Sequence, residues 1–131
     1  MFDSTAWLAA YRQAWITRNA EQVAQLFTED ATYQSHPLRP PYRGRAEIRA
    51  YWQRVTSTQD NIEVRWGTPI VAGNRMAVEW WTTMHDSEEG DVTLPGCLLL
   101  RFSEDGLCEE LREYWNLETG DRILPQTGWG T

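Results

Sequence analysis

A histidine beside a proline is the residue of this chain most obviously suited to proton transfer. His36 precedes Pro37 within residues 35–41, a stretch that holds three prolines. Because imidazole titrates near neutral pH, His36 could accept and return a proton with little tuning. The alternative is a histidine that only stabilises its loop, since loops carry structural as well as functional side chains. The residues alone leave both interpretations open.

Tryptophan is abundant in this chain, with eight residues among 131. Indole combines a large apolar ring with one N–H donor, and this combination suits the wall of a cavity better than a dry core. The composition therefore predicts a small-molecule pocket with aromatic walls.

Several other classes of site find no support. The sequence has no GxSxG, no glycine-rich phosphate loop and no HExxH. Two His and two Cys on different predicted elements favour no metal or cofactor site. The net charge of −7 argues against nucleic acid or an anionic membrane as a partner. The isolated thiols of Cys97 and Cys108, with no signal peptide and no apolar run of bilayer length, predict a reduced cytoplasmic protein.

Three helices are predicted in the first half of the chain, and each carries an apolar stripe. Asp3 or Ser4 can cap the first helix, Asn19 can cap the second, and Gly44 opens the third. We expect the second helix to close on the segment LFTEDAT. The three stripes consist of Trp7, Leu8, Tyr11 and Trp15; Val23, Leu26 and Phe27; and Ile48, Tyr51, Trp52 and Val55.

The second half changes to a period of two, which is typical of strands. The predicted strands are residues 62–71, 76–85, 92–102 and 107–116, in one antiparallel sheet. Residues 86–91 form a solvated acidic loop, and the tail from about 119 is irregular. This order predicts a single α+β domain over residues 1–131, in which a strongly curved sheet wraps the three helices into a cone.

Four segments carry a resemblance to a known family. LFTEDAT, the HP pair, YRGRAEIRAYW and LLLRFSEDGLCEELREYW resemble the nuclear transport factor 2-like superfamily, and within it the SnoaL-like polyketide cyclase and ketosteroid isomerase branch. The resemblance extends to about residue 116 and implies the cone fold. It does not fix the chemistry, because this superfamily includes isomerases, cyclases, hydrolases and non-catalytic domains.

The resemblance implies roles for particular residues. His36 falls where the isomerases hold their general base, and Tyr11 falls on their oxyanion-hole tyrosine. Trp52 replaces a second family tyrosine and can still donate through its indole N–H. The protonated Asp that completes the oxyanion hole falls on Leu98 or Cys97, which cannot replace it, so steroid isomerase activity itself is not expected. The alternative for Tyr11 is an ordinary buried tyrosine of a helix.

The same resemblance places Leu111, Glu113 and Trp115 on the inner face of the last strand. A carboxylate there is costly unless paired, so Glu113 should contact His36, Arg39, a tyrosine hydroxyl or a ligand. A pair with His36 would orient the imidazole. The alternative is a register shifted by one, with Glu113 on the surface beside an arginine.

The implied register also divides the sheet into a ligand face and a partner face. Residues expected to bind substrate are Trp15, Tyr33, Trp52, Trp80, Thr82, Leu98, Leu100, Phe102 and Trp115. Trp81 and Leu99 lie on the outer face, where we expect a homodimer interface. His85 on that face is interpreted as structural.

These observations predict a small-molecule enzyme that needs no cofactor. The reaction would be proton transfer on a hydrophobic, carbonyl-bearing substrate, in an isomerisation, an aldol-type cyclisation or a dehydration. His36 would be the base, Tyr11 and Trp52 the donors to the oxyanion, and Glu113 the orienting group or second acid. The alternative is a non-catalytic ligand-binding or assembly domain. A cavity where His36 and Glu113 converge favours the enzyme, and one filled by indoles favours the alternative.

Overall fold

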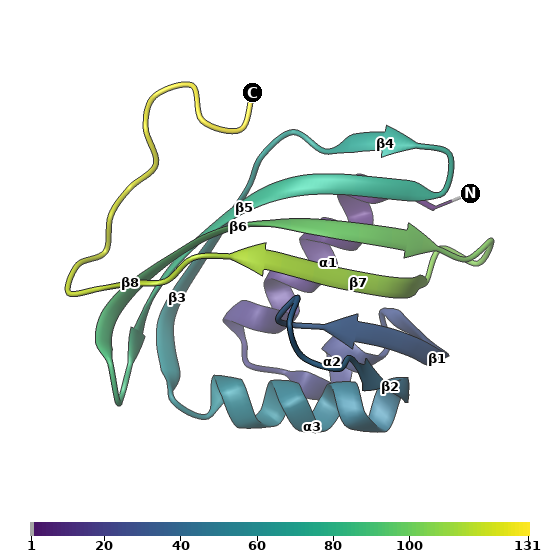
Figure 1. Cartoon of the computed structure of the whole chain (residues 1–131), viewed down its shortest axis with the longest axis horizontal. Coiled ribbons are helices and arrows are strands. Elements are labelled where there is room, and N and C mark those ends of the chain that lie inside the picture. The colour runs from purple at the N-terminus through teal and green to yellow at the C-terminus, as the bar shows by residue number, and fades with distance from the viewer. Residues whose placement is uncertain (1) are drawn as a thin grey trace.

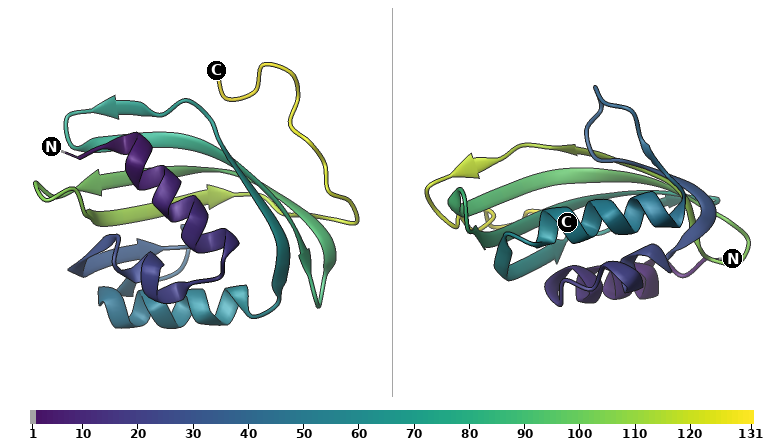
Figure 2. Two further views of the ribbon diagram at one scale, coloured as in Figure 1. Left: turned by 180° about the vertical axis from the view of Figure 1, so that it is seen from behind. Right: turned by 90° about the horizontal axis from the view of Figure 1, so that it is seen from below.

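The computed structural model describes residues 2–131 and shows one strongly curved sheet wrapped around helices (Figures 1 and 2). The helices are α1 (Ser4–Ile16), α2 (Ala20–Ala24) and α3 (Gly44–Thr56). The strands are β1 (Phe27–Gln34), β2 (Tyr42–Arg43), β3 (Gln59–Trp66), β4 (Ile70–Ala72), β5 (Arg75–Asp86), β6 (Gly90–Phe102), β7 (Cys108–Trp115) and β8 (Glu118–Thr119). The predicted α+β class, with a curved sheet around three helices, is confirmed.

The sheet is mixed rather than purely antiparallel, which corrects the prediction. Its strand order is β2-β1-β7-β6-β5-β3, with β4 on the edge of β5 and β8 on β6. All pairs are antiparallel except β1 and β7, which run parallel, with Tyr33 opposite Leu111. This pairing brings the first third of the chain against its last long strand.

Two predicted boundaries are wrong. The segment LFTEDAT does not close the second helix: α2 ends at Ala24 and β1 begins at Phe27. The expected strand over residues 62–71 is two strands, because the chain leaves β3 after Trp66 and starts β4 at Ile70. The break contains Pro69, which has no N–H to contribute to a sheet.

The helix starts follow the predicted capping residues. The Asp3 carboxylate accepts the N–H of Ala6 at 3.0 Å, and the Asn19 side chain accepts the N–H of Gln22 at 3.1 Å. These caps satisfy N–H groups that have no partner inside the helix. They fix where α1 begins, and therefore which of its residues face the sheet. Among the described residues, no helix is both long and apolar enough to cross a lipid bilayer.

The core lies between α1 and the concave face of the sheet at one end. Trp7 of α1 meets Phe102 of β6 edge to face at 5.4 Å, and Phe2 stacks on the same ring at 4.0 Å. Leu98 and Leu100 lie on this face too and are almost fully buried. Side chains therefore fill one end of the curved sheet, which leaves the other end for a cavity.

The C-terminal tail beyond β8 contains no helix or strand but is fastened to the outer face of the sheet. The indole N–H of Trp81 donates to the carbonyl of Ile123 at 2.8 Å, and the Trp129 ring meets Trp81 edge to face at 5.8 Å. The N–H of Thr68 donates to the carbonyl of Gly130 at 2.6 Å. Trp81, predicted to be an exposed partner surface, is half-covered by this chain's own tail. Figure 1 shows the path of this tail beyond β8.

Candidate active site

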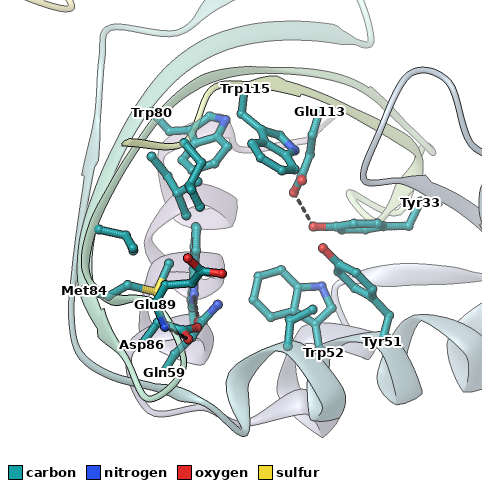
Figure 3. Close-up of a pocket in the computed structure, with 15 residues that line it drawn as sticks. Tyr33, Tyr51, Trp52, Gln59, Trp80, Met84, Asp86, Glu89, Glu113 and Trp115 are labelled. Carbon is teal, nitrogen blue, oxygen red and sulfur yellow. Dashed lines mark hydrogen bonds between the residues drawn. The ribbon is translucent and has the colours of Figure 1, made fainter. Parts of the chain in front are cut away.

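A cavity of about 220 Å³ lies at the open end of the curved sheet (Figure 3). Helices α1 and α3 close it on one side, and strands β5, β6 and β7 close it on the other. Its walls are mostly aromatic. The lining residues are Trp15, Tyr33, Tyr51, Trp52, Val55, Gln59, Trp80, Met84, Asp86, Glu89, Val92, Leu94, Glu113, Trp115 and Leu117.

Glu113 is a buried carboxylate in this aromatic wall, with 8% of its surface exposed. It sits on β7 opposite Leu98 of β6 and accepts a hydrogen bond from the Tyr33 hydroxyl. The Tyr11 hydroxyl lies 3.0 Å from that of Tyr33. Because the Tyr33 proton is committed to Glu113, Tyr11 donates to Tyr33, and the three groups form one chain from helix to carboxylate.

Burial raises the pKa of Glu113 to about 7, even though the hydrogen bond from Tyr33 lowers it. Burial, together with the negative charge of Glu113, raises the pKa of Tyr11 and of Tyr33 well above the ordinary value, so both phenols keep their protons. A carboxyl group that changes its charge near neutral pH can act as either base or acid. Glu113 therefore has the protonation behaviour that the sequence led us to expect of His36.

The four indoles of the cavity fall into two kinds. Trp15 donates to the side-chain oxygen of Gln59 at 3.0 Å, and Trp115 donates to a backbone carbonyl in the loop after β1 at 2.7 Å. The N–H groups of Trp52 and Trp80 are buried and have no partner among the described residues. An unpaired buried donor is costly, so these two indoles would gain from an acceptor on a ligand.

A glycine on β6 shapes the wall behind Trp80. A Cβ atom built on Gly96, which pairs with Trp80 across the two strands, would lie 2.6 Å from the indole ring. The ring therefore lies directly against the backbone of β6. Glycine at this position allows the indole to form the cavity wall.

His36 is placed outside this cavity. Its Nδ1 accepts the N–H of Leu38 at 3.2 Å, as in a side chain that stabilises its own turn. Its ring meets Trp115 edge to face at 6.3 Å, and with Pro37 it lines a separate surface depression. Trp115 borders both spaces, so the structure does not bring His36 and Glu113 together.

The structure gathers some of the other predicted site residues and separates the rest. Five of the nine predicted substrate-binding residues line the cavity: Trp15, Tyr33, Trp52, Trp80 and Trp115. The predicted lining is corrected at four positions, which are buried but do not line the cavity: Thr82, Leu98, Leu100 and Phe102. Tyr11 also lies in the core and does not line the cavity; its hydroxyl contacts that of the lining residue Tyr33. His85 is exposed and contacts Asp91 at 3.0 Å, on the far side of the sheet.

The sequence interpretation missed polar residues at the cavity mouth. Gln59, Asp86 and Glu89 line it, although the loop that holds the last two was expected to face only solvent. The alternation that turns Trp80 and Met84 inward continues to Asp86, and this signal could have identified it. The Asp86 carboxylate is fixed by hydrogen bonds from the side chain of Thr58 and two backbone N–H groups of its turn.

Within residues 2–131, no group of three or more His, Cys, Asp or Glu side chains is placed to hold a metal ion. The residues that line the cavity supply three carboxyl groups, one amide, two phenols and four indoles.

Solved structures of low sequence identity share this fold. A protein from Catenulispora acidiphila DSM 44928, described as having a ketosteroid isomerase-like fold and in complex with trimethylamine, is 23% identical with a TM-score of 0.74, over 82% of this chain and 83% of that one. SalBIII, described as an epoxide hydrolase/cyclase-like enzyme in pyran ring formation in the polyether salinomycin, is 18% identical with a TM-score of 0.77, over 88% and 95%. A protein from Shewanella denitrificans OS-217 described as a SnoaL-like polyketide cyclase is 14% identical with a TM-score of 0.74, over 86% and 89%. At these identities the likeness shows the fold alone.

The sequence itself matches a family. Among curated proteins no match was found. The sequence model of the SnoaL-like domain matches residues 8–111, a range that begins within α1 and ends within β7. The chain therefore belongs to the SnoaL-like domain family, within the nuclear transport factor 2-like superfamily.

Proposed function

We propose that this protein catalyses cofactor-independent proton transfer on a small hydrophobic carbonyl compound, with Glu113 as the base. The observation that carries the proposal is the burial of this carboxylate in the wall of an aromatic cavity, where desolvation raises its pKa to about 7. Buried carboxyl groups tuned in this way are common in acid–base sites.

The proposed reaction begins at a carbon next to the substrate carbonyl. The ionised Glu113 carboxylate takes a proton from that carbon, and the electrons of the broken C–H bond move onto the carbonyl oxygen to give an enolate. The unpaired indole N–H groups of Trp52 and Trp80 are candidates to donate to this oxygen. The protonated Glu113 then returns the proton to a different carbon in an isomerisation, or to a leaving oxygen in a dehydration.

Tyr33 acts on the base rather than on the substrate in this scheme. Its proton is held by Glu113, and its oxygen accepts from Tyr11. The hydrogen bond favours the ionised carboxylate, and so it limits how far burial raises the pKa of Glu113. Tyr11 and Tyr33 are therefore positioning residues, and His36 is a residue of the loop behind Trp115.

The size of the cavity restricts the substrate. Its volume of about 220 Å³ lies below the range of roughly 300–1,000 Å³ that is typical of pockets for drug-sized ligands. Structures of the same fold support the use of this scaffold for small molecules: one is described as a cyclase-like enzyme, and another is in complex with trimethylamine. We therefore propose a substrate much smaller than a steroid.

Deuterium uptake from D₂O by a panel of small ketones tests the proposal, because it detects proton removal without knowledge of the product. We expect exchange by the wild-type protein to fall as the pH drops below about 7, where Glu113 becomes protonated. Glu113→Gln should lower the exchange rate by about 10²–10⁴-fold.

His36→Ala is the matched control, because it removes the other candidate base from outside the cavity. It should keep most of the exchange activity. If His36→Ala abolishes exchange and Glu113→Gln does not, the base has been wrongly assigned. If the wild-type protein and both variants bind the ketones and none of them catalyses exchange, the protein is a non-catalytic binding domain.

A further inference from the structure

The charged side chains that line the cavity all carry the same sign. Asp86, Glu89 and Glu113 line it, and no Arg, Lys or His among the described residues does. Arg54 is close to the aromatic wall, with its guanidinium carbon 5.5 Å from the centre of the Tyr51 ring, but it is not one of the lining residues. An anionic ligand would be repelled by this set of carboxylates, so the wall favours a neutral or positively charged molecule.

The aromatic walls of the cavity favour a positively charged molecule over a neutral one. Four indoles and two phenols line the cavity. They meet at steep angles rather than in stacks: Trp15 lies 5.4 Å from Trp52 at 79° and 5.6 Å from Trp80 at 61°. Faces arranged around a common space attract a cation through the negative charge of the ring faces, and indole is the strongest of the side-chain rings in this respect. A neutral molecule gains only the burial of its apolar surface.

The polar groups lie at two ends of the cavity (Figure 3). Glu113 and the Tyr33 hydroxyl are at one end, and Trp52, 3% exposed and without a partner for its N–H, lies on the same side. Asp86 and Glu89 are at the opposite end. Asp86 is tied to its turn, whereas the Glu89 carboxylate makes no ion pair with any described residue.

We infer that the ligand of this cavity is a small molecule with a positively charged amine group, which lies among the indole faces at the Asp86–Glu89 end. Its oxygen lies at the other end, where it accepts the N–H of Trp52 beside Glu113. The inference rests on the proposed function, because it describes the substrate of the same cavity. It adds the charge of that substrate and its orientation.

A pair of probes of one shape isolates the charge. Choline and its neutral carbon analogue 3,3-dimethyl-1-butanol have the same size and the same hydroxyl group, and differ only in the cationic nitrogen. Binding is measured by titration calorimetry at pH 8 and low ionic strength, and followed in parallel by tryptophan fluorescence. We expect choline to bind at least about tenfold more tightly than the alcohol. Equal affinity, or tighter binding of the alcohol, overturns the inference.

Two neighbouring glutamates give a matched pair of variants that spares the fold. Glu88 and Glu89 are both exposed in the turn between β5 and β6, but only Glu89 lines the cavity. Glu89→Gln should weaken choline binding about two- to fivefold and leave the alcohol unchanged, and Glu88→Gln should have a clearly smaller effect. Equal effects of the two substitutions would show that choline responds to the general negative charge of the protein, against the orientation inferred.

The outcomes separate this inference from the proposed function. If ketone exchange depends on Glu113 but choline is not preferred over the alcohol, the proposed reaction is supported and the inference of a positively charged amine is wrong. A preference for choline that depends on Glu89, without any ketone exchange, keeps the amine and identifies the protein as a binding domain.

Discussion

Glu113 couples the stability of the protein to the chemistry proposed for it. A carboxylate held at 8% exposure among aromatic rings loses most of its hydration, and one hydrogen bond from Tyr33 compensates only in part. The protonated form of Glu113 is therefore favoured more strongly in the folded protein than in the unfolded chain. A base kept in this state gains reactivity, and the folded state loses stability each time the group ionises.

This coupling predicts how stability depends on pH. The pKa of Glu113 is raised from 4.5 to about 7 on folding, so between these values the folded protein binds more protons than the unfolded chain. The stabilisation is fully present below pH 4.5 and is lost as the pH rises through 7. The total loss is about 3 kcal/mol.

Urea unfolding of the wild-type protein and of Glu113→Gln at a series of pH values isolates this contribution, because the other titrating groups are common to both. The wild-type protein should lose stability relative to the variant between pH 4.5 and 8. A difference that is constant over this range would show that Glu113 titrates normally in the folded state.

At the scale of elements, the contact between β5 and β6 at Gly96 supports a second prediction. Gly96→Ala would place a methyl group 2.6 Å from the Trp80 ring, so the indole must move out of its place in the cavity wall. We expect a loss of about 1–3 kcal/mol of stability, typical of overpacking, together with weaker ligand binding.

A double-mutant cycle tests the cause. In a Trp80→Leu background, whose smaller side chain leaves room for the methyl group, Gly96→Ala should cost much less stability. The same cost in both backgrounds would mean that the backbone of β6, and not the indole, requires glycine.

The elements that depend on local signals were predictable from the sequence. Asp3 and Asn19 cap α1 and α2 as expected, and the strands from residue 75 onward follow the alternation of apolar residues. Strand β1 was missed because Leu26 and Phe27 continue the apolar spacing of the helix before them. Its partner β7 is distant in the sequence, and pairing over that separation leaves no local pattern.

The site was predictable to a similar degree. The strand register implied by the family resemblance was enough to predict that Glu113 and Trp115 face the interior. The number of tryptophans was enough to predict an aromatic cavity. The sequence could not show that Trp115 stands between His36 and the cavity, because that depends on how the loop after β1 packs. It also could not show that α1 fills the end of the sheet near Leu98, which leaves that residue in the core.

At the scale of the whole molecule, the tail divides the outer face of the sheet. Trp81 is partly covered by Trp129 and Ile123 of the same chain, whereas Leu99 lies beyond the tail, in a shallow groove with Ile70 and Ala77. The homodimer predicted from the sequence remains a proposal, and we propose Leu99 rather than Trp81 as its centre.

Light scattering at micromolar concentration tests this assembly. The wild-type protein should have the mass of a dimer, and Leu99→Arg should have the mass of a monomer, because it replaces an apolar side chain by a further positive charge beside Arg75, Arg101 and Arg112. Trp129→Ala is the control on the covered part of the face and should keep the dimer. A monomeric wild-type protein would refute the proposal.

The parallel pairing of β1 with β7 also has a consequence for biosynthesis. Tyr33 and Glu113, the proposed positioning residue and base, are 80 positions apart. At ordinary rates of translation, roughly 4–16 seconds separate their appearance on the ribosome. Until then β7, which pairs with one edge of β1 in the folded protein, is not available, and a β1 strand formed early would leave that edge unpaired. The cavity, which Glu113 and Trp115 of β7 line, therefore cannot form until the last long strand has been synthesised.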